Sequence, residues 1–215
     1  MKNILVIGIG RFGLHTVKRL SEIGHDVLII DSNEERLEKG LAYAVNGQIG
    51  NSTNEAFIRS IGVSQFDMCF VCIGDDFQAS LETTCLLKEA GAPVVISRAS
   101  DDAQAKFLLR NGADHVVYPQ KEMAEWAAIR YTADGLIDYI EVDDDHGIYE
   151  LNIPGDWVGK TLAQLDIRRK YNINIIGYRK KPDIEYMVSP DVELTADISL
   201  IVFGATNDVY RCFRL

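Results

Sequence analysis

The hydrophobic pattern of the N-terminal segment predicts a strand, a helix and a second strand. An apolar run at residues 4–7 leads into a glycine-rich segment, residues 8–13, and apolar residues then recur at helical spacing over residues 14–23. A second apolar run, residues 27–30, ends at Asp31. Continuous apolar runs are typical of buried strands, and recurrence on one helical face is typical of an amphipathic helix. The order is that of a βαβ unit.

This alternation continues as far as residue 118. Helical patterns cover residues 33–41, 54–61, 77–90 and 101–110, and strand patterns lie at 47–49, 68–73, 94–97 and 115–118. Gly91 and Pro93 are among the turn residues that separate them. Strands that alternate with helices in this way predict an α/β fold with a doubly wound parallel sheet of the Rossmann type.

The pattern changes after one more helix, at residues 120–131. Asp134-Gly135 makes a turn, and strand patterns at 137–142 and 148–153 predict a hairpin around an acidic loop. We interpret this loop as a solvated turn, and the alternative is a site for a divalent ion. A short helix around Leu162 and Leu165 follows, with extended pieces at 173–178, near 187–188 and at 198–203. We therefore predict two domains, residues 1–134 and a smaller α+β domain at residues 135–215.

The glycine-rich segment has the spacing G-x-G-x-x-G of a dinucleotide-binding turn. In that motif Gly8 permits the tight turn, Gly10 lets a pyrophosphate approach the backbone, and Gly13 lets helix and strand pack closely. The helix N-terminus offers unpaired N–H groups to phosphate. Asp31, at the end of the next strand, can accept hydrogen bonds from both ribose hydroxyls, which disfavours the 2′-phosphate of NADP. The alternative is a purely structural turn in which Asp31 caps the next helix.

Arg11 lies between the second and third glycines, at the start of the predicted helix. A guanidinium there adds charge and a bidentate donor beside the phosphates. This favours a ligand with more phosphate charge than NAD, such as ATP or ADP. The alternative is an exposed arginine, which the helix dipole slightly disfavours.

In parallel sheets, ligands bind beyond the carboxyl ends of the strands. Polar residues follow several of these predicted ends, and Asn51 can donate and accept along an adenine edge while Arg98 can contact phosphate. Each also has an ordinary structural interpretation, as a helix cap or a surface charge. The candidate cofactor-binding residues are Gly8, Gly10, Arg11, Phe12, Gly13, Asp31, Ser32, Asn33, Asn51, Ser52, Gly74, Asp75 and Arg98.

Composition excludes several classes of partner. The chain has 215 residues and a net charge of −10, from 22 basic and 32 acidic side chains, so a broad basic surface for nucleic acid or anionic lipid is not expected. No apolar run approaches the roughly 18 residues that span a bilayer, and the first apolar stretch is interpreted as a buried strand, not as a signal peptide. Cys69 and Cys72 are three residues apart on a predicted strand and should face opposite sides, as buried thiols in a reducing cytoplasm.

Several motifs carry a resemblance to a known family. The N-terminal half resembles the RCK_N (KTN) module through Gly8-Ile9-Gly10-Arg11-Phe12-Gly13, Asp31, Gly50-Asn51-Ser52-Thr53, Ala113-Asp114 and Pro119-Gln120-Lys121-Glu122-Met123. Gly159-Lys160-Thr161-Leu162 and Leu165-Asp166-Ile167-Arg168 resemble the RCK_C module. Together the modules cover almost the whole chain and are similar to the cytosolic regulatory subunits of Ktr/Trk-type potassium uptake systems.

The resemblance implies a gating-ring subunit and not an enzyme. It implies a homo-oligomer, dimeric and typically assembled into an octameric ring, on the cytoplasmic face of an integral membrane potassium-translocating subunit. ATP and ADP, or alternatively NAD/NADH, would bind the Rossmann site and favour different ring shapes. Carried over by position, Arg11 and Arg98 would meet phosphates, Asp31 the ribose and Asn51 the adenine.

Three positions bear on the family's further ligands. Relatives have an acid after Gly50, where this chain has Asn51, which keeps adenine contact but changes its polarity. Ktr relatives carry an acid just after Pro119 that is implicated in divalent-cation binding, and the neutral amide of Gln120 is a poor sole ligand for Mg²⁺ or Ca²⁺. Some family members bind cyclic di-AMP between RCK_C modules through an arginine and an asparagine, which correspond here to Arg168 and Asn174.

The rival hypothesis is an NAD-dependent oxidoreductase. Such an enzyme needs an acid or base at the nicotinamide, and no tyrosine here is followed by a lysine four residues later. His15, His25 and His115 are interpreted as structural or surface residues. A redox-sensing transcription factor is a third hypothesis, but the chain has no helix-turn-helix candidate.

Overall fold

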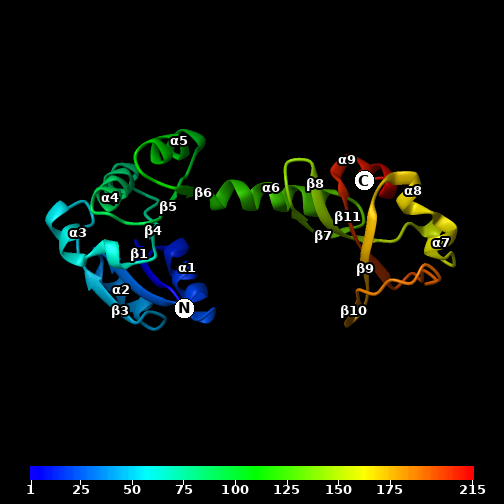
Figure 1. The fold of residues 1–215 in the computed structure, drawn as a ribbon, viewed down its shortest axis with the longest axis horizontal. Helices are drawn as coiled ribbons and strands as arrows, with labels where there is room; N and C mark the ends of the chain where they lie inside the picture. Colours follow the sequence, from blue (N-terminus) through cyan, green and yellow to red (C-terminus); the bar gives the residue numbers. More distant parts are fainter. The chain divides into compact units, whose positions relative to one another are not determined.

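The computed structural model describes all 215 residues, which form two compact units, Met1–Glu122 and Met123–Leu215. The division falls inside helix α6 (Pro119–Thr132), which is labelled in Figure 1 and contributes residues to both units. Ile129 and Ala133, at the end of this helix, pack against the core of the second unit. The domain limits 1–134 and 135–215 stay a prediction. They were placed after α6 because the sequence pattern changes only where this helix ends.

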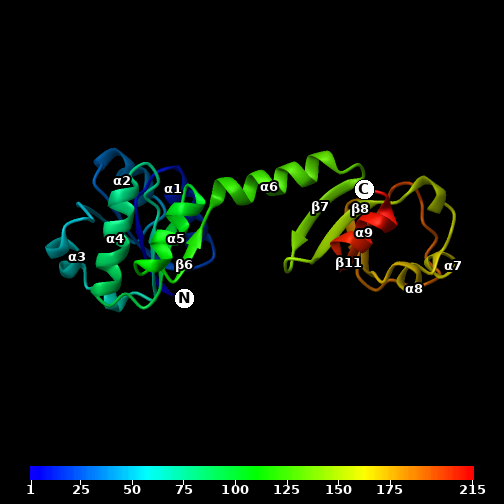
Figure 2. The same cartoon turned by 90° about the horizontal axis from the view of Figure 1, so that it is seen from above.

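The first unit is a six-stranded parallel sheet with the strand order β3-β2-β1-β4-β5-β6. This is the order of a doubly wound Rossmann sheet, so the predicted fold class is confirmed. Figures 1 and 2 show helices on both sides of the sheet. The strands are β1 Asn3–Ile7, β2 Asp26–Asp31, β3 Asn46–Ile49, β4 Met68–Val71, β5 Val95–Arg98 and β6 His115–Val117. The helices are α1 Arg11–Glu22, α2 Glu34–Leu41, α3 Glu55–Ile61, α4 Phe77–Glu89 and α5 Asp102–Arg110.

Side-chain caps decide where four of these helices begin. The side chains of Asn33, Asn54, Asp76 and Asp101 each accept a hydrogen bond from the backbone N–H three residues later. Such caps satisfy donors that the first helical turn leaves unpaired. Three of these helices therefore start one residue later than the hydrophobic pattern predicts, and α4 starts where it was expected.

The core of this unit lies on both faces of the sheet. One buried cluster contains Ile58 of α3 and Leu87 of α4, and the other contains Val17 of α1 and Leu37 of α2. Cys69 belongs to the first cluster and Cys72 to the second, so the expectation that these thiols face opposite sides is confirmed. Burial raises the pKa of each thiol to about 12, which keeps it protonated and unreactive at neutral pH.

The second unit is a five-stranded antiparallel sheet with the order β10-β9-β11-β8-β7. Its strands are β7 Leu136–Glu141, β8 His146–Asn152, β9 Asn174–Lys180, β10 Asp183–Glu185 and β11 Ile198–Ala205. Its helices are α7 Leu162–Leu165, α8 Ile167–Tyr171 and α9 Thr206–Phe213. The prediction of an extended piece near 187–188 is wrong, because the strand that pairs with β9 is β10, a few residues earlier. Helices α8 and α9 were not anticipated.

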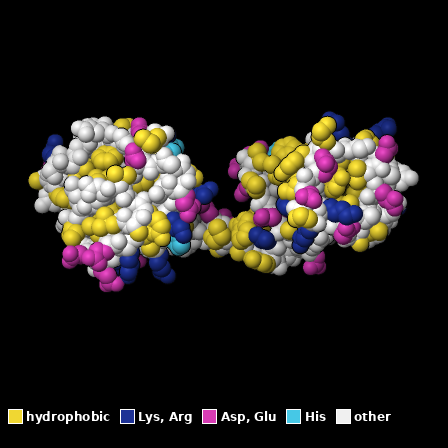
Figure 3. All heavy atoms as spheres, turned by 90° about the horizontal axis from the view of Figure 1, so that it is seen from below, with side chains coloured by type: hydrophobic (Ala, Val, Ile, Leu, Met, Phe, Trp, Pro, Cys, Tyr) yellow, Lys and Arg dark blue, Asp and Glu magenta, His cyan; other side chains and the backbone are white.

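One buried cluster holds the second unit together. It joins Leu151, Leu200 and Val202 of the sheet to Trp157 and Phe213, whose ring centroids lie 5.2 Å apart. No helix in either unit combines the length and the apolar character that crossing a membrane requires. On the face of the molecule drawn in Figure 3, side chains of both charges are interspersed and form no broad basic region.

Candidate functional site

A cavity of about 650 Å³ opens at the carboxyl ends of the parallel strands. This volume lies within the range of small-molecule sites, roughly 300–1,000 Å³. The lining comes from the loops that follow strands β1 to β5 and from the start of α6. Most of the predicted residues line it, namely Gly8, Gly10, Arg11, Phe12, Asp31, Ser32, Asn51, Ser52, Gly74, Asp75 and Arg98. Gly13 and Asn33 do not.

The three glycines of the turn have different structural roles. Gly8 has φ +90°, a left-handed conformation that favours glycine. A Cβ on Gly13 would lie 2.0 Å from the Gly8 carbonyl oxygen, so Gly13 allows the close packing of α1 on the turn. A Cβ on Gly10 would meet no atom within 4 Å. Gly10 therefore leaves open space on the cavity side of the loop, where a ligand can approach the backbone.

Asp31 holds the glycine turn in place and also faces the cavity. Its Oδ2 accepts a hydrogen bond of 2.6 Å from the Ile9 N–H, and its Oδ1 accepts one of 2.8 Å from the Asn33 N–H. The side chain is buried, with 6% exposed. Each carboxylate oxygen has a second lone pair, so the acid can still accept from a ligand hydroxyl. Asn33 supports this arrangement from behind, as the cap of α2.

Asn51 and Ser52 are also held by the protein. The Asn51 Oδ1 accepts from the backbone N–H and the hydroxyl of Thr53, at 3.0 and 2.9 Å, which leaves its amide N–H groups free to donate. The buried Ser52 hydroxyl pairs with the Thr83 hydroxyl at 2.8 Å. Neither residue caps α3, since Asn54 does so. Asn51 can therefore act mainly as a donor.

Arg98 lies across Gly74 at the floor of the cavity. A Cβ on Gly74 would lie 2.0 Å from one terminal nitrogen of this guanidinium, so a side chain at this position would displace the guanidinium. The guanidinium also lies 5.9 Å from the centroid of the Phe12 ring, and its buried Nε has no hydrogen-bond partner. Its positive charge partly offsets the effect of burial on the pKa of Cys72, which also lines the cavity. A positioned cation with a donor to spare is suited to an anionic ligand.

The cavity is lined by three aspartates, Asp31, Asp75 and Asp76, and by three arginines. Arg11, Arg36 and Arg98 all line it, and none of them forms an ion pair with the protein. Arg36 was not among the predicted residues, and neither was His15, which also lines the cavity. His15 is exposed, in agreement with its interpretation as a surface residue, and it also borders the cavity. The position of His15 at the cavity could have been predicted from its spacing of four residues from Arg11, because such residues share a helix face.

The second unit has a smaller cavity of about 240 Å³. Arg168 and Asn174 both line it, together with Ile167, Val188 and Pro190. Arg168 makes no ion pair and is exposed. The two residues that the sequence singled out in this unit are thus brought to one site.

Comparison with known proteins places the chain in a family. Residues 4–119 match the TrkA-N domain and residues 148–215 match the TrkA-C domain. The chain is 37% identical over 213 residues to the Ktr system potassium uptake protein C of Bacillus subtilis (strain 168), covering 98% of this chain and 95% of that protein. This chain belongs to the Ktr/Trk potassium uptake protein family. The predicted RCK resemblance is confirmed.

Further comparisons agree with this membership. The Ktr system potassium uptake protein A of the same organism is 33% identical over 210 residues, which cover 98% of this chain and 95% of that protein. Among solved structures, the GsuK RCK domain superposes with a TM-score of 0.70 at 18% identity, covering all of this chain and 47% of that one. The GsuK channel bound to NAD superposes with a TM-score of 0.68 at 17% identity, covering 98% and 38%. At these identities the structural likeness shows a shared fold.

Gln120 occupies a defined place in this Ktr/Trk family member. It lies at the start of α6 and lines the large cavity. Its amide can donate to and accept from a ligand, but it brings no charge for a cation. The sequence expectation that Gln120 is a poor cation ligand stays a prediction.

Proposed function

We propose that this protein is the nucleotide-binding regulatory subunit of a potassium uptake system, with an adenine nucleotide bound in the large cavity. The observation that carries the proposal is the set of unpaired arginines around an open glycine turn. In a chain of net charge −10, guanidinium groups without carboxylate partners are suited to a ligand that brings several negative charges. ATP or ADP provides these charges, and NAD or NADH is the alternative ligand.

Each part of the ligand has a matching group. The phosphates lie at the N-terminus of α1, against Arg11 and Arg98, where helix N–H groups also favour anions. The ribose hydroxyls donate to Asp31, and the adenine edge accepts from the Asn51 amide. Ser32, Ser52, Gly74 and Asp75 complete the walls.

Regulation follows from assembly. The proposed working form is a homo-oligomer, dimeric and ultimately an octameric ring, on the cytoplasmic face of an integral membrane subunit that moves potassium. A ligand shifts the ring between two shapes only as far as it binds them with different affinities, and moving a population from 1:99 to 99:1 takes roughly a 10⁴-fold difference. Support for the partner comes from the names of the Ktr relatives. Cyclic di-AMP is proposed for the smaller cavity, with Arg168 and Asn174 as its contacts.

The test is a calorimetric titration of the purified protein with ATP, ADP and NADH, with the solution mass measured on the same sample. We expect ATP and ADP to bind a multi-subunit assembly and NADH to remain unoxidised on addition of carbonyl substrates. Binding of NADH alone to a monomer, with consumption of NADH, would contradict the proposal and favour an oxidoreductase.

A further inference from the structure

Arg36 lines the large cavity, and no interaction with the protein accounts for the position of its side chain. It lies in the first turn of α2 and lines the large cavity beside Asp31 and Ser32. Its side chain is exposed and forms no ion pair or hydrogen bond. The neighbouring acid Glu35 pairs instead with Lys39, at 2.8 Å. The guanidinium is therefore free.

A free cation at this place is electrostatically unfavourable by itself. The first turn of a helix carries partial positive charge, which stabilises acids and disfavours bases. Arg11, the first residue of α1, is in the same unfavourable situation and lines the same cavity. By contrast, an ion pair is formed by each of Arg19, Arg59, Arg130, Arg179, Arg211 and Arg214. Two helix starts around one cavity thus both present an unpaired arginine.

The backbone around Arg36 indicates which part of a ligand it meets. The Arg36 N–H donates to the Asn33 side chain at 2.9 Å, and the Asn33 N–H donates to Asp31 at 2.8 Å. This chain of hydrogen bonds fixes the first turn of α2 to the end of β2. Arg36 therefore belongs to the Asp31 side of the cavity, where the ribose is proposed, and Arg11 belongs to the glycine turn, where the phosphates are proposed.

Two chemical roles are open to a guanidinium beside the ribose. One is to bind a 2′-phosphate, but that group would face the negative charge of Asp31 at short range, which is repulsive. The other is to stack its planar face on the adenine ring, which a guanidinium does readily and an ammonium does less well. The position of Asp31 favours the second role.

We propose that Arg36 is a binding residue that stacks on the adenine of the bound nucleotide. This inference rests on the proposed nucleotide site and adds a contact to the base that Asn51 reaches only at its edge. The contact is common to ATP, ADP and NADH, because all three carry adenosine. It is absent for inorganic tripolyphosphate, which has no base.

The experiment measures Kd for ATP, ADP, NADH, NADPH and tripolyphosphate on the native protein and on Arg36→Ala and Arg36→Lys. Lys39→Ala, on the same helix and outside the cavity, is the matched control. We expect Arg36→Ala to weaken ATP, ADP and NADH alike, by about tenfold, and to leave tripolyphosphate unchanged. Arg36→Lys should recover only a small part of the loss, and Lys39→Ala should change nothing. Thermal unfolding checks that every variant is folded.

Other patterns of loss would overturn the inference. A loss that grows from ADP to ATP, or that extends to tripolyphosphate, would place Arg36 at the phosphates. If the native protein binds NADPH more tightly than NADH and Arg36→Ala does not, Arg36 binds the 2′-phosphate. Unchanged binding of all ligands in Arg36→Ala would remove Arg36 from the site and leave the proposed function standing. Failure of the native protein to bind any of these nucleotides would overturn the proposed function itself.

Discussion

Arg179 in the second unit and the arginines around the large cavity of the first unit are used in opposite ways. In the second unit, Arg179 on β9 reaches Glu150 on β8 through two hydrogen bonds, Nε to Oε1 at 2.7 Å and a terminal nitrogen to Oε2 at 3.0 Å. Ser199 on β11 donates to the same carboxylate at 2.7 Å. In the first unit, the arginines around the large cavity have no carboxylate partner at all.

The difference is between an arginine whose charge is already paired within the protein and arginines that are free to bind an anionic ligand. The Glu150 carboxylate is satisfied within its own sheet, and the hydrogen bonds that Arg179 donates to it lower the pKa of that carboxyl. The cavity arginines have the same capacity for bidentate bonding but no anion to use it on. Substitutions at Gly13 and Glu150 should therefore lower folding stability. A substitution at Asp31 should lower both stability and ligand affinity, and one at Arg11 should lower ligand affinity alone.

The largest effect on stability is expected at Gly13. In Gly13→Ala the new Cβ would lie 2.0 Å from the Gly8 carbonyl oxygen, and both groups are backbone or attached to it, so they cannot move apart cheaply. We expect the free energy of unfolding of the first unit to fall by about 3 kcal/mol or more. Denaturant unfolding measures it. Gly10→Ala is the matched control, since its Cβ meets no protein atom within 4 Å.

The same pair of variants also probes the ligand. Gly10→Ala should fold normally and still bind ATP more weakly, because its methyl group would occupy the space in which a phosphate approaches the loop. Equal stability of the two variants would contradict the packing role of Gly13. Unchanged ATP affinity in Gly10→Ala would contradict the placement of the phosphates.

At Glu150 we expect a loss of about 2 kcal/mol in Glu150→Gln, since charged hydrogen bonds to Arg179 and Ser199 are weakened. The pH dependence has a definite sign. Because the folded-state pKa lies below its ordinary value of 4.5, the stabilisation is fully present above that pH and is lost as pH falls through the folded-state pKa. Acid unfolding of the native protein and of Glu150→Gln measures this. An equally steep loss of stability at acid pH in the native protein and in Glu150→Gln would show that Glu150 is not the cause of that loss.

Asp31→Asn should show a mixed effect. The amide retains one acceptor but places an NH₂ group against a backbone N–H, so we expect about 1.5 kcal/mol less stability in the first unit. Binding of every ribose-containing ligand should weaken as well, measured by calorimetry. Asp26→Asn, at the other end of β2, serves as control. Normal affinity for ATP, ADP and NADH in Asp31→Asn would show that the ribose lies elsewhere.

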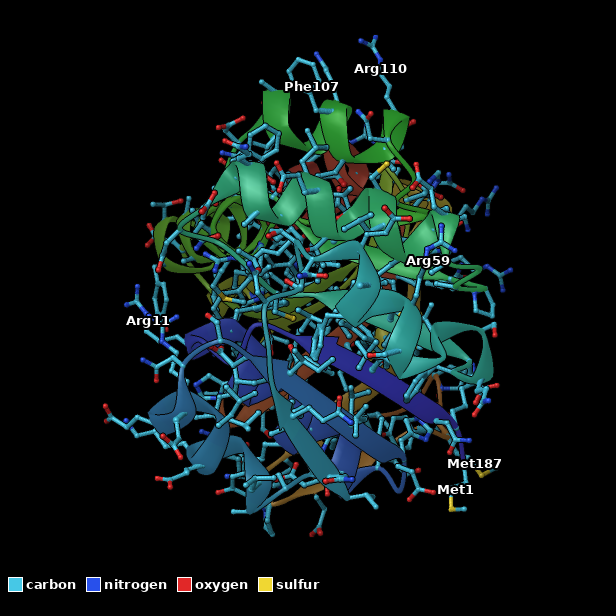
Figure 4. The ribbon with its side chains drawn as sticks, turned by 90° about the vertical axis from the view of Figure 1, so that its left-hand side faces the viewer. Met1, Arg11, Arg59, Phe107, Arg110 and Met187 are labelled. Carbon is cyan, nitrogen blue, oxygen red and sulfur yellow. The ribbon has the colours of Figure 1, made fainter.

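The smallest effect is expected at Arg11, whose side chain projects from the ribbon in Figure 4, as does that of Arg110. Arg11→Ala should leave stability unchanged, because the side chain has no protein partner, and should weaken ATP about tenfold, more than NADH. Arg110→Ala on α5 should alter neither property. Equal weakening of ATP and NADH in Arg11→Ala would place Arg11 away from the terminal phosphates.

Local features of this protein could be read from the chain alone. The glycine turn, the acid at the end of β2 and the helix starts depend on groups a few residues apart, so residue type and spacing decide them. Asn33 shows the limit. Its capping role is local, whereas its position outside the cavity lining depends on the fold, and its role toward a ligand stays a prediction.

Other features depended on the tertiary structure. Arg36 joins the cavity because β2 lies beside β1 in the sheet. Glu150 meets Arg179 and Ser199, which are 29 and 49 residues away in the sequence. No short-range pattern contains such pairings, since they arise when strand order and register bring distant side chains to one place. The sequence determined the kind of site and the family, and the fold decided which charges were neutralised and which were left for a ligand.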